Sequence, residues 1–179
     1  MPLIKDNSFT KDHWTALPDG LPLAGAVDAI ISFKRLEQDW DEISLHNGRV
    51  GVLLDNSSDA EALQPYLDRL DLVVLEFPVF NDGRAYSQAR IVRSQLGFSG
   101  EIRATGDVLP DQAGLMMRCG FDSFEVSGGQ SLEVWQRAAN SLTLSYQRNY
   151  PKVGEKPRHD RSERAAAILT DTDRAGAAL

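Results

Sequence analysis

Two short segments of the chain, residues 77–87 and 106–112, gather side chains that could bind a ligand or a partner. A guanidinium holds an oxyanion or a carboxylate through its planar fork of N–H donors, and carboxylates and amides supply further polar contacts. Both segments are therefore candidates for an anion-binding or partner-binding site. The polar residues concerned are Asp82, Arg84, Asp107, Asp111 and Gln112.

Arg84 is the least ordinary of these residues because it begins a predicted helix. The N-terminus of a helix is the positive end of its dipole, so a cation there is unfavourable unless it pairs with an acid or binds an anion. Two interpretations remain open. Arg84 forms an ion pair with Asp82 or Asp107, or it forms an anion site together with the N–H groups of the helix.

Asp107 and Asp111 also have two interpretations. They flank the start of a helix that Pro110 is expected to open, where a carboxylate caps the helix and interacts with its dipole. Alternatively, the same two carboxylates belong to the candidate site.

Other kinds of chemistry find little support in the sequence. Cys119 is the only cysteine, so the chain has no internal disulfide and cannot hold an iron–sulfur cluster alone. Three scattered histidines predict no metal site, and a flavin would have to bind without a recognised motif. Cys119 lies near the end of a predicted helix, where the dipole raises a thiol pKa, so we expect a packing role for it.

The charge balance narrows the class of partner. The chain has 19 basic and 26 acidic residues, a net charge of −7, which does not suit a phosphate backbone. No apolar run approaches the ~18 residues of a membrane span, and the first residues lack the apolar core of a signal peptide. We therefore expect a cytoplasmic protein that binds neither nucleic acid nor a membrane.

From residue 27 onward, apolar strand runs alternate five times with segments of helical periodicity. The strands are predicted at 27–31, 50–54, 72–75, 101–105 and 121–126. The helices are predicted at 33–46, 59–67, 84–96, 110–118 and 132–146.

Five alternating units predict an α/β fold with a parallel sheet. A flavodoxin-like open sheet with strand order 2-1-3-4-5 is the first expectation, and a partial TIM-like barrel is the alternative. Residues 1–26 are expected to form an N-terminal hairpin or arm outside the repeat. Because Asp55, Asp82 and Asp107 each follow a strand, we expect all three at one edge of the sheet.

The chain is expected to contain one α/β domain, residues 1–147, followed by a flexible or loosely docked tail, residues 148–179. The tail carries seven basic and five acidic residues, a net of +2, which leaves −9 on the rest. Two prolines and a glycine within 149–158 leave too few apolar side chains to offset the entropy of ordering.

Three blocks of the sequence resemble a bacterial family, the domain of unknown function 934. They read F-P-V-F-N-D-G-R-A-Y-S-Q-A-R-I-V-R, then G-E-I-R-A-T-G-D-V-L-P-D-Q, then R-C-G-F-D-S-F. The resemblance includes the opening M-P-L-I-K-D and covers about residues 1–147. Ala85 departs from it, since the family usually has glycine there, and the tail is not covered.

The resemblance adds Tyr86 and Gln88 to the candidate site. Members of this family are commonly encoded beside assimilatory sulfite reductase. The resemblance therefore implies an accessory protein or an oxidoreductase of sulfite reduction that acts with sulfite reductase. A non-catalytic docking protein, which would use the aromatic residues of the 77–86 loop, and a small-anion-binding domain are the alternatives.

Replacing Arg84 with lysine separates a structural from a functional role. Lysine keeps the charge but lacks the planar fork, so we expect Arg84→Lys to leave the melting temperature almost unchanged while it impairs sulfite-dependent growth or binding to sulfite reductase. A matching loss of stability and function would assign Arg84 to the scaffold, and normal growth and binding would remove it from the site.

Overall fold

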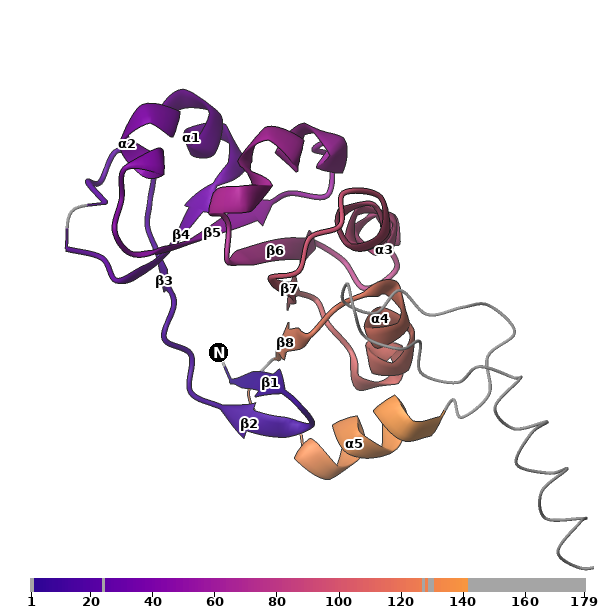
Figure 1. Cartoon of the computed structure of the whole chain (residues 1–179). Helices are drawn as coiled ribbons and strands as arrows, with labels where there is room; N and C mark the ends of the chain where they lie inside the picture. The colour runs from indigo at the N-terminus through magenta and orange to yellow at the C-terminus, as the bar shows by residue number, and fades with distance from the viewer. Residues whose placement is uncertain (1, 24, 127, 129–130, 142–179) are drawn as a thin grey trace, which may run out of the picture.

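The computed structural model describes residues 2–23, 25–126, 128 and 131–141. It contains one curled sheet of eight strands in the order β2-β1-β8-β7-β6-β5-β4-β3 (Figure 1). The end of the predicted domain, 142–147, and the predicted tail, 148–179, lie outside the described residues. The strands are β1 (Leu3–Lys5), β2 (Ser8–Thr10), β3 (Thr15–Ala16), β4 (Asp28–Ser32), β5 (Arg49–Leu54), β6 (Leu72–Phe77), β7 (Glu101–Gly106) and β8 (Ser123–Glu125).

Strands β4 to β8 are parallel and lie side by side in the order of the sequence. The flavodoxin-like order is therefore wrong, and the TIM-like alternative fits this half-barrel. In a flavodoxin-like sheet the strand order reverses, so helices cover both faces. Here every crossover moves the chain one strand further in the same direction, and right-handed crossovers then place all helices on one face.

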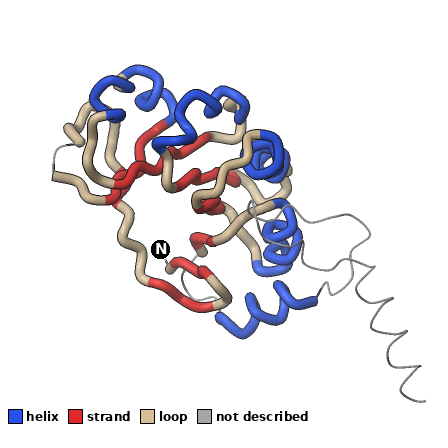
Figure 2. Tube along the Cα trace, in the orientation of Figure 1, coloured by secondary structure: helices blue, strands red, loops and turns tan. Residues whose placement is uncertain are grey.

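The helices lie on the outer face of the curled sheet (Figure 2), and the apolar core fills the space between the two layers. None of the described helices is long and apolar enough to cross a membrane. The helices are α1 (Phe33–Gln38), α2 (Trp40–Ser44), the 3₁₀ helix η1 (Ala60–Arg69), α3 (Arg84–Arg90) with its π-helical continuation η2 (Ile91–Gln95), the 3₁₀ turn η3 (Pro110–Gln112), α4 (Ala113–Cys119) and α5 (Leu132–Ser141).

The N-terminal arm contains the predicted hairpin but does not lie outside the sheet. Asp6 and Asn7 turn the chain with φ values of 51° and 58°, a left-handed conformation that these two residue types tolerate. Strand β1 then pairs antiparallel with β8, and β3 pairs parallel with β4. The arm thereby covers both free edges of the parallel sheet, whose unpaired backbone groups need partners.

The arm also explains why the sheet is curled. Strands β2 and β3 form the two opposite edges of the sheet, yet only residues 11–14, which we call the strap, separate them in the sequence. So few residues reach about 17 Å at most. Eight strands laid flat would hold their edges about 34 Å apart. The sheet must therefore curl into a half-barrel, with the strap passing across its inner face.

A group of buried charges lies under the strap. The guanidinium of Arg103, on β7, is only 1% exposed and is 2.8 Å from a carboxylate oxygen of Asp12 in the strap. It also lies 3.1 Å from Glu101 and 3.8 Å from Glu125. Residues 101, 103 and 105 face inward, whereas Ile102 and Ala104 pack in the core on the helix side. Arg103 thus connects the strap to the inner face.

The aromatic residue of the strap packs on the neighbouring part of the inner face. A Cβ atom at Gly51 would be 3.2 Å from the ring of Trp14, so only glycine leaves room for this contact without a shift. The guanidinium of Arg49 lies 4.9 Å from the centroid of the same ring, at a cation–π distance. The strap is therefore held by one charged and one aromatic contact.

Arg103→Met should destabilise the fold strongly. The substitution leaves three carboxylates without their shared cation, and removing one partner of a buried ion pair costs about 3–5 kcal/mol. We expect the free energy of unfolding, measured by urea denaturation, to fall by about 3 kcal/mol or more. Arg137→Met, at an exposed position of α5, is the control and should change it by less than about 0.5 kcal/mol. Similar effects of the two substitutions would contradict this role of Arg103.

Candidate functional site

Three of the predicted carboxylates lie at one edge of the sheet. Asp55 follows β5, Asp82 lies in the loop after β6, and Asp107 follows β7, and these strands are parallel. The expectation that they share the carboxyl edge is therefore confirmed. Side-chain contacts join the loops, since Asn56 Nδ2 donates a hydrogen bond of 2.7 Å to Asp82 Oδ2.

Arg84 pairs with Asp82 and not with Asp107. Arg84 Nη2 is 2.6 Å from Asp82 Oδ2, and Nε is 3.0 Å from Oδ1. The side chain of Arg84 is 59% exposed. The hydrogen bonds from Arg84 lower the pKa of Asp82 to about 2, so this carboxylate stays charged. The ion pair occupies two of the donors that would otherwise hold an oxyanion.

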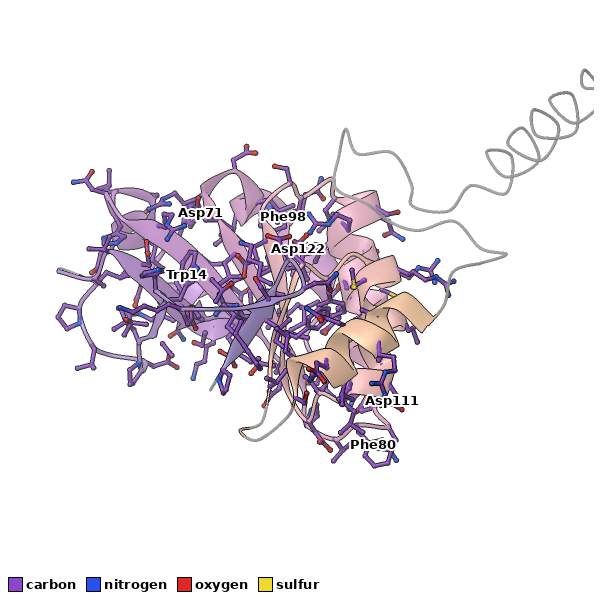
Figure 3. The ribbon with its side chains drawn as sticks, turned by 90° about the horizontal axis from the view of Figure 1, so that it is seen from below. Trp14, Asp71, Phe80, Phe98, Asp111 and Asp122 are labelled. Carbon is purple, nitrogen blue, oxygen red and sulfur yellow. The ribbon has the colours of Figure 1, made fainter. Side chains whose placement is uncertain are left out.

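The loop after β6 presents an aromatic side chain to solvent. Asp82 N–H donates to Val79 O at 3.0 Å, which closes a turn with Phe80 near its tip. Val79 and Phe80 are 49% and 52% exposed. We call residues 78–83 the tip loop. Figure 3 shows Phe80 and Asp111 at one end of the molecule, opposite Asp122, which precedes a strand.

Two predicted site residues hold Phe80 by its backbone. Asp107 Oδ2 accepts a hydrogen bond from Phe80 N–H at 3.1 Å, and Gln112 Nε2 donates to Phe80 O at 2.7 Å. Both backbone groups of Phe80 are thereby satisfied by the loop that follows β7. The exposed ring consequently projects from a backbone that the loop after the neighbouring strand holds in place.

Tyr86 and Gln88, on α3, contact strand and loop residues at the carboxyl edge of the sheet. The ring of Tyr86 meets that of Phe77 edge-on at 5.2 Å, and burial raises the pKa of Tyr86 to about 12. Gln88 is 5% exposed, and its Nε2 donates to Asp55 O and Ser58 O at 2.8 and 2.9 Å. Its Oε1 is buried without a hydrogen-bond partner among the described residues. Both side chains therefore make contacts within the fold.

Asp111 differs from the other candidates because it is exposed and makes no hydrogen bond or ion pair that involves another described residue. It stands beside Gln112, whose amide holds Phe80. The predicted residues therefore fall into three groups. Asp82, Asp107 and Gln112 hold the tip loop, Tyr86 and Gln88 pack beneath, and Arg84 and Asp111 face solvent.

The cysteine lies at the opposite end of the strands. Cys119 is 8% exposed at the end of α4, and Gly120 follows it with the left-handed φ of 108° expected there. Burial raises the pKa of the Cys119 thiol more than Arg90 and Arg118 lower it. Within the described parts of the chain, no group of three or more metal-binding side chains comes together.

The sequence interpretation missed three buried arginines, Arg35, Arg93 and Arg103. Arg93 is 2% exposed, and its Nη2 is 2.6 Å from Asp122, while its Nε and Nη1 donate to the carbonyl oxygens of Gly120 and Phe98. Arg103 lies in a strand that is half polar, so its burial does not follow from the composition of the strand. The alternation of Glu101, Arg103 and Thr105 with Ile102 and Ala104 was the signal of a polar inner face.

Gly106→Ala should destabilise the site. Gly106 has a φ of 92°, and a Cβ there would be 2.3 Å from Phe77 O, so alanine would push β7 away from β6. A left-handed non-glycine residue alone costs about 1–3 kcal/mol, so we expect a loss of at least this size in denaturant unfolding. Gly128→Ala, which would meet no atom of the described residues within 4 Å, is the control. A loss no larger than that of the control would contradict the tight approach at Gly106.

Comparisons with known proteins place these residues in a family. A family model described as "Bacterial protein of unknown function (DUF934)" matches residues 51–156, which is more than half of the chain. The match includes the tip loop and the loop after β7, whereas the strap lies before it. No curated protein matches the chain. The chain therefore belongs to this bacterial family of unknown function.

Proposed function

We propose that this protein is an accessory protein of assimilatory sulfite reduction that docks on sulfite reductase through its tip loop and performs no chemical step itself. The observation that carries the proposal is the exposed ring of Phe80 on a backbone held by Asp107 and Gln112. The choice of partner rests on the resemblance to a family whose members are encoded beside sulfite reductase.

The physical argument concerns the cost of ordering a binding loop. A flexible loop loses conformational freedom when it binds, and this loss weakens the complex. Here the turn at Val79 and the two hydrogen bonds to Phe80 already order the loop in the free protein. Large aromatic side chains contribute strongly at the centre of protein interfaces. Phe80 and the adjacent Val79 are therefore suited to enter an apolar pocket of a partner.

An oxidoreductase of the same pathway is the other candidate, and its chemistry finds less support. A thiol acts as a nucleophile in its deprotonated form, and burial raises the pKa of Cys119, the only cysteine of the chain. A small-anion-binding domain would use Arg84, whose Nε and Nη2 are already directed at Asp82. The docking function gives a role to the exposed apolar residues of the tip loop.

Phe80→Ala should weaken binding to sulfite reductase. Truncating an aromatic anchor typically costs about 2 kcal/mol or more, so we expect the Kd measured by isothermal titration calorimetry to rise by about 30-fold. The melting temperature should remain unchanged because Phe80 is an exposed residue.

Leu45→Ala is the matched control for this experiment. Leu45 is 81% exposed and lies between α2 and the amino end of β5, away from the tip loop. The control variant should bind like the unaltered protein. Docking through the tip loop would be refuted by equal affinities of the Phe80→Ala variant and the control. A visible flavin spectrum in the untagged protein would favour the oxidoreductase instead.

A further inference from the structure

Resting on the proposed function, we infer that the surface recognised by the tip loop is an apolar pocket bordered by an arginine or lysine, and that this cation pairs with Asp111. The inference concerns the chemistry of the partner surface. It follows from the charges around Phe80 and from the contacts that each of them already makes.

The carboxyl-edge loops carry a strong excess of negative charge. Residues 55–59, 78–84 and 107–112 contain five aspartates and one arginine, with no other charged residue. The hydrogen bonds from Ser57 and Ser58 lower the pKa of Asp55 to about 2, so this carboxylate stays ionised. The single arginine, Arg84, is paired with Asp82. The apolar tip is therefore surrounded by negative charge that the loops themselves do not neutralise.

Four of these five aspartates make hydrogen bonds or an ion pair within the chain. Asp59 accepts a hydrogen bond from Glu61 N–H at the start of η1, and Asp107 accepts one from Phe80 N–H. Asp55 accepts hydrogen bonds in the turn after β5, and Asp82 pairs with Arg84. Asp111 has no such contact with the described residues, although it is exposed next to the amide that holds Phe80.

This arrangement selects the partner by charge. An acidic surface or a nucleic acid would be repelled by the loops, whereas a cation beside the pocket would be attracted while Phe80 enters it. Attraction between exposed charges also speeds association and weakens as salt screens it. Asp111 is the carboxylate that can accept such a cation without giving up a contact of its own.

The test compares variants of the full chain in binding to sulfite reductase at several salt concentrations. Asp111→Asn should raise the Kd by about 5-fold at low salt, and Asp111→Lys should raise it by about 10-fold or more. The loss should reside mainly in the association rate, and the salt dependence of Kd should become shallower. Asp111→Asn should leave the melting temperature almost unchanged, because Asp111 makes no hydrogen bond or ion pair with the described residues. Asp111→Lys places a cation in the first turn of the helical segment that begins with η3, so it should lower the melting temperature slightly.

Asp68→Asn is the matched control, since Asp68 is an exposed aspartate near the end of η1, ahead of β6. It should leave the affinity and the salt dependence unchanged. If Phe80→Ala weakens binding while both Asp111 variants bind normally, the inference about the cation is overturned and the docking function stands. If Phe80→Ala also binds normally, the proposed docking function is refuted, and the inference that rests on it is refuted with it.

Discussion

The four-residue strap between β2 and β3 is the constraint on which the rest of this structure depends. Because it joins opposite edges of an eight-stranded sheet, the sheet cannot lie flat. Curling gives the sheet an inner face, which the strap crosses, and an outer face, which the helices cover. Charged residues of β7 and β8 that would face solvent on an open sheet become enclosed under the strap. The guanidinium of Arg103 is buried for this reason, and Asp12 of the strap pairs with it.

The same sheet geometry assembles the candidate site. Neighbouring parallel strands bring their carboxyl ends together, so the loop after β7 lies against the loop after β6. Gly106 allows the close approach, since any side chain would collide with Phe77 O. Asp107 and Gln112 then form hydrogen bonds with the backbone of Phe80, so residues outside the tip loop hold it in place. The site therefore consists of one presented aromatic ring and the polar residues that fix its direction.

Two arginines show how burial changes the role of one chemical group. Arg103 is almost fully enclosed, and its carboxylate partners compensate a charge that would be costly to bury alone. Arg84 makes an even shorter ion pair at the surface, where water screens the interaction. The first arginine belongs to the stability of the half-barrel. The second lies at the surface, among the acidic residues beside the tip loop.

Local patterns in the sequence were sufficient for the alternating strands and helices, for the hairpin at Asp6 and Asn7, and for the shared edge of Asp55, Asp82 and Asp107. These features depend on side-chain periodicity, on turn chemistry and on the parallel pairing that follows from alternation. The order of the strands was not determined locally, because an apolar strand run pairs equally well with several neighbours. Tertiary structure decided that order, together with the burial of Arg103, the choice of Asp82 over Asp107 as the partner of Arg84, and the exposure of Phe80. The strand order, the burial of Arg103 and the engagement of Asp107 by Phe80 N–H depend on which distant segments the curled sheet brings into contact, and residue type and spacing do not specify those contacts.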